Sequence, residues 1–153
     1  MSRNYYSEIN MHFVWHTKLS WPMLTPEIEL ATHRHLKQKL VNLPGAFVHE
    51  IGGTENHVHL AVTLTPTLLI SDLIGQVKGA SSHEVNQVLG RGRKVLEWQT
   101  GYGVVSFGTK DLEWVISYIR NQREHHAKRT FQERLERITA DESQAQALQR
   151  EAP

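Results

Sequence analysis

Cysteine is absent from the 153 residues of this chain. Its absence excludes disulfide bonds, thiolate zinc sites and cysteine nucleophiles, and it is typical of proteins that work in a reducing cytoplasm. Long hydrophobic runs are absent too, because no apolar stretch approaches the roughly 20 residues that cross a bilayer. Residues 1–13 lack the apolar segment of a signal peptide, so we expect none. These absences predict a cytoplasmic protein with no transmembrane helix.

A phosphate-binding loop of the form G-x-x-x-x-G-K-[ST] is also missing, so we expect no nucleotide cofactor. An excess of either charge is also absent: the net charge is +1, and residues 1–131 hold only three more basic than acidic residues. This mild excess permits a nucleic-acid partner without requiring one. What the chain has in quantity is histidine, with ten residues.

The hydrophobic residues make up 39% of the chain, which supports a single domain with a core. We expect this domain to span residues 1–137 and to be followed by a polar, flexible tail over residues 138–153. Polar and apolar alternation predicts strands, and apolar residues three and four apart predict helices. The predicted strands are residues 8–17, 46–51, 56–64 and 102–107, and the predicted helices are residues 26–41, 69–89 and 109–138.

The order of these segments predicts an α+β fold of the ferredoxin-like split βαββαβ type, with a central antiparallel sheet. Gly52 and Gly53 are expected to form the turn of a hairpin between the second and third strands. Two helices should cover one face of the sheet. The last helix, which carries Tyr118, is then left to cover part of the other face.

Two histidines stand one residue apart in the predicted strand 56–64. Residues two apart share a face of a strand, so His57 and His59 should point away from the core while Val58 and Leu60 point into it. Two imidazoles whose Cα atoms are about 6–7 Å apart can bind one metal ion. Each can equally be a hydrogen-bonded or solvated surface histidine, and the H-x-H spacing alone leaves both interpretations open.

The last predicted helix carries two further candidates. Tyr118 and Gln122 are four residues apart and therefore share one helix face, beside an apolar stripe. Taken separately, they are a rim tyrosine with its hydroxyl in water and an ordinary surface glutamine. Beside two metal-binding imidazoles, Gln122 would offer a carbonyl oxygen and Tyr118 a hydroxyl nucleophile.

Five segments in order along the chain carry a family resemblance. They are FVWHT at residues 13–17, HVH at 57–59, QVKGASS at 76–82, WQTGYG at 98–103 and YIRNQ at 118–122. The H-x-H spacing is unspecific by itself, but the ordered set is specific. It resembles the single-tyrosine HUH transposases of bacterial insertion sequences, which are IS200-like, and their REP-associated tyrosine transposase relatives.

The resemblance implies a bacterial cytoplasmic enzyme, at the nucleoid when bound to DNA, that binds single-stranded DNA with a hairpin. His57, His59 and Gln122 would hold a divalent ion, Mg²⁺ or Mn²⁺, although imidazole ligands by themselves favour zinc and later transition metals. Tyr118 would attack the scissile phosphate, form a 5′-phosphotyrosine linkage and release a 3′ hydroxyl. A second 3′ hydroxyl could then rejoin the strand. Some family members exchange tyrosine helices in a homodimer and others act alone, so both states stay open.

Cations and flat side chains are the groups that bind single-stranded DNA. Near-neutral net charge predicts few phosphate contacts and recognition of a folded DNA shape. The histidines on the first strand could support the metal ligands instead of contacting DNA, and the basic loop after the second helix could serve solubility. The candidate DNA contacts are Lys78, Arg91, Arg93, Lys94, His12 and His16.

Two other functions compete with the transposase interpretation. A non-catalytic DNA-hairpin-binding regulator derived from such an enzyme would keep the same fold. A histidine-based nucleotide phosphoesterase fits less well, because Ala61 stands where an H-x-H-x-H enzyme needs a third histidine. Enzymes with paired H-x-[ST] motifs are disfavoured as well, since residues 16–18 and 57–59 both lack that form.

Overall fold

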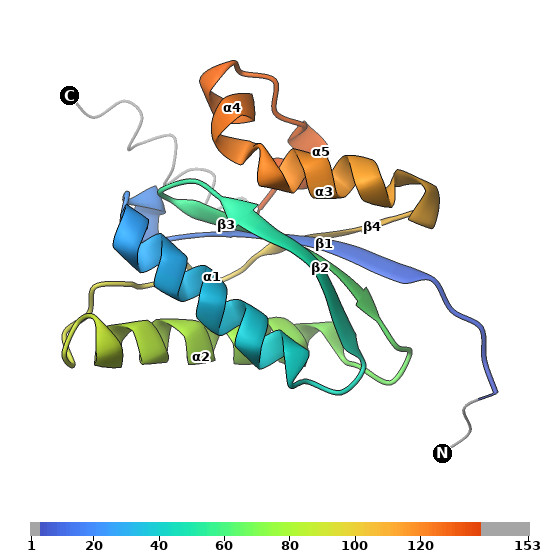
Figure 1. Cartoon of the computed structure of the whole chain (residues 1–153), viewed down its shortest axis with the longest axis horizontal. Coiled ribbons are helices and arrows are strands. Elements are labelled where there is room, and N and C mark those ends of the chain that lie inside the picture. The colour runs from blue at the N-terminus through green and yellow to red at the C-terminus, as the bar shows by residue number, and fades with distance from the viewer. Residues whose placement is uncertain (1–3, 139–153) are drawn as a thin grey trace.

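The computed structural model describes residues 4–138, and its centre is one four-stranded antiparallel sheet between two layers of helices (Figure 1). The strands lie side by side in the order β2-β3-β1-β4. This order and the antiparallel pairing are those of a ferredoxin-like split βαβ sheet, so the predicted α+β fold is confirmed. Apart from Ile138, the tail predicted over residues 138–153 lies outside the described residues. The strands are β1 (Ile9–His16), β2 (Ala46–Gly53), β3 (His57–Leu64) and β4 (Gly103–Phe107).

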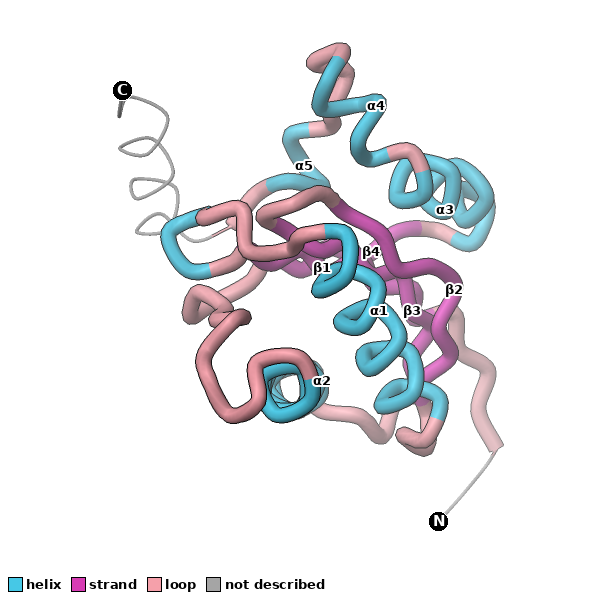
Figure 2. The backbone as a smooth tube through the Cα atoms, turned by 60° about the vertical axis from the view of Figure 1, so that its left-hand side comes forward, coloured by secondary structure: helices cyan, strands magenta, loops and turns pink. Residues whose placement is uncertain are grey.

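One face of the sheet is covered by α1 (Pro26–Val41) and α2 (Ile70–Val88), as Figures 1 and 2 show from two directions. Helix α1 begins with proline in its first turn, where the missing N–H costs nothing. The apolar members of the alternating strands pack against these helices, and Phe13, Trp15 and Leu60 are fully buried there. The polar members of the same strands therefore face the opposite layer, as period-two alternation predicts.

The prediction of one continuous helix over residues 109–138 is wrong. The segment forms a short 3₁₀ turn, η2 (Thr109–Asp111), and three helices. Backbone angles outside the helical region at Asn121 (φ −103°, ψ 28°) separate the first two helices, and Arg129 with φ 55° helps to reverse the chain before the third. The helices are α3 (Leu112–Arg120), α4 (Gln122–Ala127) and α5 (Glu133–Glu136). All three cover the sheet face opposite α1 and α2 (Figure 2).

The two glycines predicted to form the hairpin turn belong to β2 instead. Gly52 pairs with His59 and Gly53 with Val58, so the connection is made by residues 54–56. Helix α3 crosses β2 at this point. A Cβ atom on Gly52 would lie 2.4 Å from the carbonyl oxygen of Ile119, so only glycine lets the helix approach this closely.

Replacing Gly52 by alanine is expected to destabilise the fold by about 1–3 kcal/mol, because the backbone of α3 must shift to admit the methyl group. The matched control is Gly75→Ala in α2, where an added Cβ meets nothing within 4 Å. That change should leave stability equal or raise it by about 0.5–1 kcal/mol, since alanine favours helix. Urea unfolding of both variants measures the difference, and equal midpoints would contradict the close approach.

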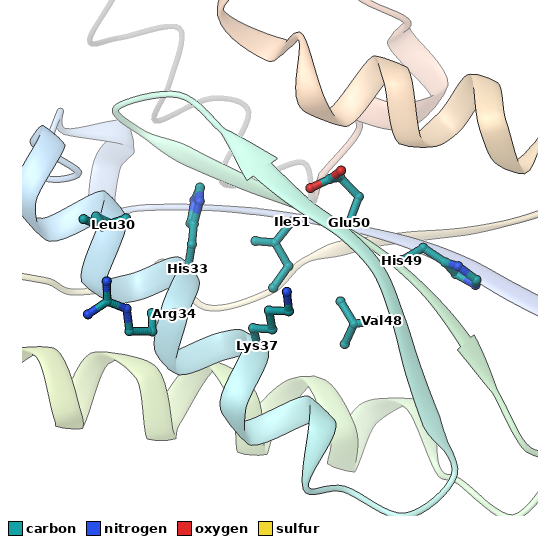
Figure 3. Close-up of a pocket in the computed structure, with 8 residues that line it drawn as sticks. All are labelled: Leu30, His33, Arg34, Lys37, Val48, His49, Glu50 and Ile51. Carbon is teal, nitrogen blue, oxygen red and sulfur yellow. The ribbon is translucent and has the colours of Figure 1, made fainter.

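An open cleft between α1 and β2 is lined on the helix side by His33, Arg34 and Lys37 (Figure 3). At its rim, the Glu50 carboxylate accepts a hydrogen bond of 2.8 Å from Arg120 at the end of α3. This ion pair joins the end of α3 to the edge strand β2, next to the close contact at Gly52. Within residues 4–138, no helix has both the length and the apolar character needed to cross a bilayer.

Candidate functional site

Four histidines gather on the sheet face beneath α3–α5. His57 and His59 project from β3, and His12 and His16 project from the adjacent strand β1. The His16 ring stacks on His57 with a centroid separation of 4.9 Å, and His12 lies at the same distance from His59. All four side chains are buried. The strand pairing therefore turns two separate period-two patterns into one cluster.

Hydrogen bonds fix the orientation of the two central rings. His57 Nδ1 lies 2.7 Å from Asn56 Oδ1 and 2.9 Å from Thr54 Oγ1. His59 Nδ1 lies 2.8 Å from His12 Nε2. Partners at Nδ1 leave the Nε2 atoms of both rings facing the space below α4, which is the arrangement that metal-binding histidines use.

Tyr118 on α3 and Gln122 at the start of α4 both come to this cluster from the other layer, although the break at Asn121 separates their helices. Both side chains are buried, and Gln122 Oε1 lies 3.2 Å from His57 Nε2. The Tyr118 ring lies edge-on to His59 at a centroid separation of 5.9 Å. Stacking of Tyr118 between Trp114 and His125 holds the ring in place. The structure thus brings together the four residues singled out in the sequence, Tyr118 as the proposed nucleophile and the three proposed ligands.

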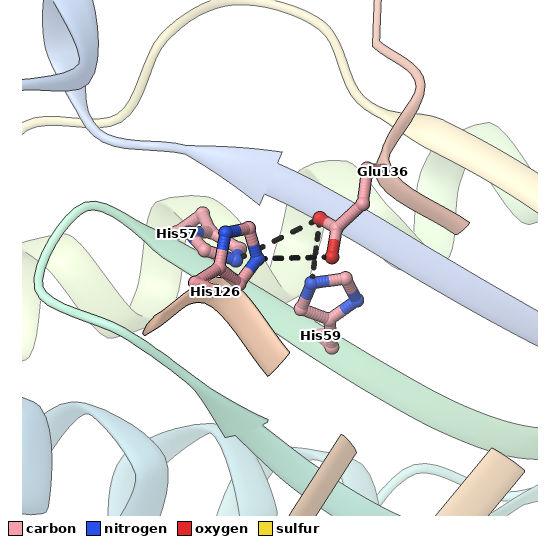
Figure 4. Close-up of side chains that lie close together, drawn as sticks. All are labelled: His57, His59, His126 and Glu136. Carbon is pink, nitrogen blue, oxygen red and sulfur yellow. Dashed lines mark hydrogen bonds and ion pairs between the residues drawn. The ribbon is translucent and has the colours of Figure 1, made fainter. Parts of the chain in front are cut away.

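Two further residues join the same space, His126 from α4 and Glu136 from α5 (Figure 4). One carboxylate oxygen of Glu136 accepts a hydrogen bond of 2.7 Å from the Tyr118 hydroxyl and lies 3.1 Å from His126 Nε2. The other carboxylate oxygen lies 3.0 Å from His59 Nε2 and 3.7 Å from His57 Nε2. A single carboxylate therefore touches both the hydroxyl and the imidazole pair.

The surroundings set the protonation states of these groups. Burial, assisted by the neighbouring His59, holds the pKa of His57 well below the ordinary value of imidazole, so His57 is neutral at pH 7. Burial also raises the pKa of Tyr118 above that of a free phenol, against the lowering effect of the Gln132 N–H. Burial alone would raise the pKa of Glu136, but His126 and His59 outweigh it and hold that pKa well below the usual range. The site therefore combines a neutral imidazole, a protonated phenol and a carboxylate.

The donor set fits a divalent metal ion. Ligands bound at about 2.0–2.2 Å to one ion lie about 3–3.5 Å apart. The His57–Gln122 and His59–Glu136 contacts, at 3.2 and 3.0 Å, are of this size, and the His57–Glu136 contact is slightly longer at 3.7 Å. Among the described residues, the buried His59 Nε2 has no partner with hydrogen-bond geometry, although the Glu136 oxygen lies close. A nitrogen and a carboxylate that converge without an aligned hydrogen bond suit a shared cation. The cluster of histidines and glutamate could therefore hold an ion.

The proposed DNA contacts do not form one surface. Lys78 lies on α2, across the sheet from the histidines, and its Nζ donates hydrogen bonds of 2.8 and 2.7 Å to the Gln99 and Gly101 carbonyls. His12 and His16 are buried behind the central imidazoles, which favours a supporting role over contact with DNA. The basic loop that follows α2 is solvent-exposed, and it consists of Arg91, Arg93 and Lys94.

Sequence reasoning missed His126 and Glu136. His126 continues the four-residue spacing of Tyr118 and Gln122, and that spacing was a signal that could have identified it. Glu136 offered no such signal. In the predicted continuous helix it would stand about 27 Å from Tyr118 along the axis, at about 1.5 Å per residue. The chain reversal after α4 brings the two side chains to 2.7 Å instead.

Replacing His12 by phenylalanine is expected to weaken metal binding by about 10–100-fold, because His59 loses the partner that orients its ring. The unpaired Nδ1 should also lower stability by about 1–3 kcal/mol. His12→Gln keeps an acceptor near the same position and should lose less of the affinity. Titration of the purified protein with Mn²⁺ measures both variants, and equal affinities for His12→Phe and the unaltered protein would contradict the supporting role.

Comparisons with known proteins bear on the family and the fold. The family described as "Transposase IS200 like" matches residues 5–122, which is most of the chain. A Deinococcus radiodurans R1 protein, provisionally classed as a transposase, is 22% identical with a TM-score of 0.62, and the match covers 80% of this chain and 96% of that one. A REP-associated tyrosine transposase, solved with a REP hairpin, is 21% identical with a TM-score of 0.58, and the match covers 82% of this chain and 73% of that one. No curated protein sequence matches. At these identities the two structures show a shared fold.

Proposed function

The chain belongs to the IS200-like transposase family, and from this membership we propose that it cleaves and rejoins hairpin-bearing single-stranded DNA through a phosphotyrosine intermediate. The observation that carries the proposal is the position of the Tyr118 hydroxyl. The hydroxyl donates a hydrogen bond to one carboxylate oxygen of Glu136, and the other oxygen of the same carboxylate lies 3.0 Å from His59 Nε2. A hydroxyl nucleophile beside a candidate metal site suits metal-assisted phosphoryl transfer through a covalent intermediate.

His57, His59 and Gln122 are the residues that would hold the ion, Mg²⁺ or Mn²⁺ by analogy with the family. When bound, such an ion polarises the scissile phosphate and neutralises charge on its oxygens. Support comes from the two Nε2 atoms that face one space and from Gln122 Oε1 at 3.2 Å from His57. The Gln122 amide nitrogen donates to the Tyr118 carbonyl at 3.1 Å, which turns its oxygen toward the histidines.

Tyr118 is proposed as the nucleophile. Its oxygen would form a bond to the phosphorus at the 5′ side of the cleaved linkage, while the 3′ oxygen leaves with the electrons of the broken bond. The phenol loses its proton in this step, and the departing 3′ oxygen gains one. The phosphotyrosine ester conserves the bond energy, so attack by a second 3′ hydroxyl can rejoin DNA without a nucleotide cofactor.

Several features support a subunit that works with its own tyrosine. Tyr118 lies beside His59 of the same chain, and the Gln132 N–H donates a hydrogen bond of 2.8 Å to its hydroxyl. A homodimer in which tyrosine helices are exchanged stays the alternative.

The exposed loop of Arg91, Arg93 and Lys94 offers cations to a DNA backbone. Binding of a REP hairpin is known for the structural relative, and here it supports a folded DNA target by analogy.

The decisive experiment traps DNA on the protein. Fragmented single-stranded genomic DNA is incubated with protein and Mn²⁺, covalent complexes are isolated under denaturing conditions, and the attached DNA is sequenced. We expect fragments joined through their 5′ phosphate to Tyr118 and enriched in sequences next to hairpins. Hairpin binding without any covalent product would favour the alternative function, a non-catalytic regulator derived from such an enzyme.

A further inference from the structure

Glu136 lies beside the two histidines of the HUH pattern but is not part of that pattern. We propose that Glu136 is itself a ligand of the metal ion and that the C-terminal segment completes the site. The inference rests on the proposed function only in assuming that an ion binds at His57 and His59. The donor atoms of His57, His59, His126 and Glu136 all lie within 4.8 Å of one another (Figure 4).

The geometry of the carboxylate is that of a ligand. One Glu136 oxygen lies 3.0 Å from His59 Nε2, which is the spacing of neighbouring ligands around an ion, and 3.7 Å from His57 Nε2, which is slightly longer. The contact with His59 lacks hydrogen-bond geometry, although the two atoms are only 3.0 Å apart. The second oxygen is held by the Tyr118 hydroxyl and by His126, so the carboxylate is oriented by partners as bound ligands usually are.

Glu136 lies in a segment, residues 130–137, that hydrogen bonds and packing hold in place. The Thr130 N–H donates a hydrogen bond of 2.8 Å to the His125 carbonyl and closes the reversal after α4. Leu135 is buried, and Arg134 donates a hydrogen bond of 2.7 Å to the Ser106 carbonyl on β4. Gly103 of β4 admits the Arg137 carbonyl, which would lie 1.9 Å from a Cβ atom at that position. These contacts dock the segment on the sheet at both sides of Glu136.

A carboxylate ligand changes which ion the site prefers. Imidazoles favour zinc and later transition metals, whereas carboxylate oxygens suit manganese and magnesium. Glu136 therefore supplies the hard anionic donor that the histidine pair lacks. Because its other oxygen holds the Tyr118 hydroxyl, the same side chain places the nucleophile next to the ligand sphere.

The test measures metal binding by the full chain without DNA. Affinities for Mn²⁺ and Zn²⁺ are determined by calorimetry for the unaltered protein, Glu136→Gln and Glu136→Ala. The matched control is Glu133→Gln, because Glu133 lies on the same helix with its side chain 84% exposed. We expect both Glu136 variants to bind Mn²⁺ at least about tenfold more weakly and to lose less affinity for Zn²⁺. The control should stay within about twofold of the unaltered protein.

Unchanged or tighter Mn²⁺ binding by Glu136→Gln would overturn the proposal and would identify Glu136 as an occupant that the ion displaces. Equal losses for both metals would overturn it too, because a purely structural role does not discriminate between them. Failure of the unaltered protein to bind Mn²⁺ without DNA would also count against a site completed within the chain. Covalent trapping on Tyr118 judges the proposed function separately, since it needs no particular role for Glu136.

Discussion

Tyr118→Phe is expected to abolish the covalent protein–DNA adduct, with a loss of about 10³-fold or more, while hairpin binding persists. The change removes only the hydroxyl oxygen, so the ring can keep its stacking on Trp114 and His125. Removing a nucleophile costs far more than removing a contact, because no other group replaces the covalent step. The assay is a labelled hairpin oligonucleotide incubated with protein and Mn²⁺ and resolved on a denaturing gel.

Two controls keep this result interpretable. Tyr102→Phe removes a hydroxyl from a half-buried tyrosine that packs on Phe13 and lies outside the site, so its adduct yield should be unchanged. Thermal unfolding checks the fold, since Tyr118 also loses two hydrogen bonds worth about 1 kcal/mol each. An adduct that survives in Tyr118→Phe would place the nucleophile elsewhere and remove the basis of the proposal.

The second large effect is expected from His59→Gln, which should weaken Mn²⁺ binding by roughly a hundredfold or more. His59 is fully buried, its Nδ1 is engaged by His12, and its Nε2 faces the shared space. Removing a ligand from such a set should cost more than the about 10–100-fold lost with a supporting residue. Adduct formation should fall in parallel and should vanish in the unaltered protein when a chelator removes the ion.

His83→Gln is the matched control, because His83 is exposed on α2 across the sheet from the site. It should bind Mn²⁺ and form the adduct like the unaltered protein. If His59→Gln binds metal normally and loses only adduct formation, the ion does not bind at the histidine pair. If both binding and adduct formation persist, the histidines serve packing alone.

The difference between prediction and structure is greatest in the C-terminal third. The strand pattern placed His57 and His59 on one face because it uses local periodicity, and the four-residue spacing brought Tyr118 and Gln122 together although a break separates their helices. The break at Asn121 escaped prediction, since the helical pattern continues on either side of it. The hydrogen bonds of Lys78 to the Gln99 and Gly101 carbonyls join two separate segments, so no local pattern reveals them, and its contact with DNA stays a prediction.

The sequence by itself determined which residues share a face of each strand and helix, because alternation and helical spacing act within one element. It also determined the order of the elements, and hence the sheet with two helices on one side. Only the tertiary structure decided that the chain reverses after α4 and brings Glu136 to Tyr118 and the histidines. The position of Glu136 depends on the burial of Leu135 and on the contacts of Arg134 and the Arg137 carbonyl with β4. Packing between segments so far apart in the chain produces no periodic pattern in the sequence.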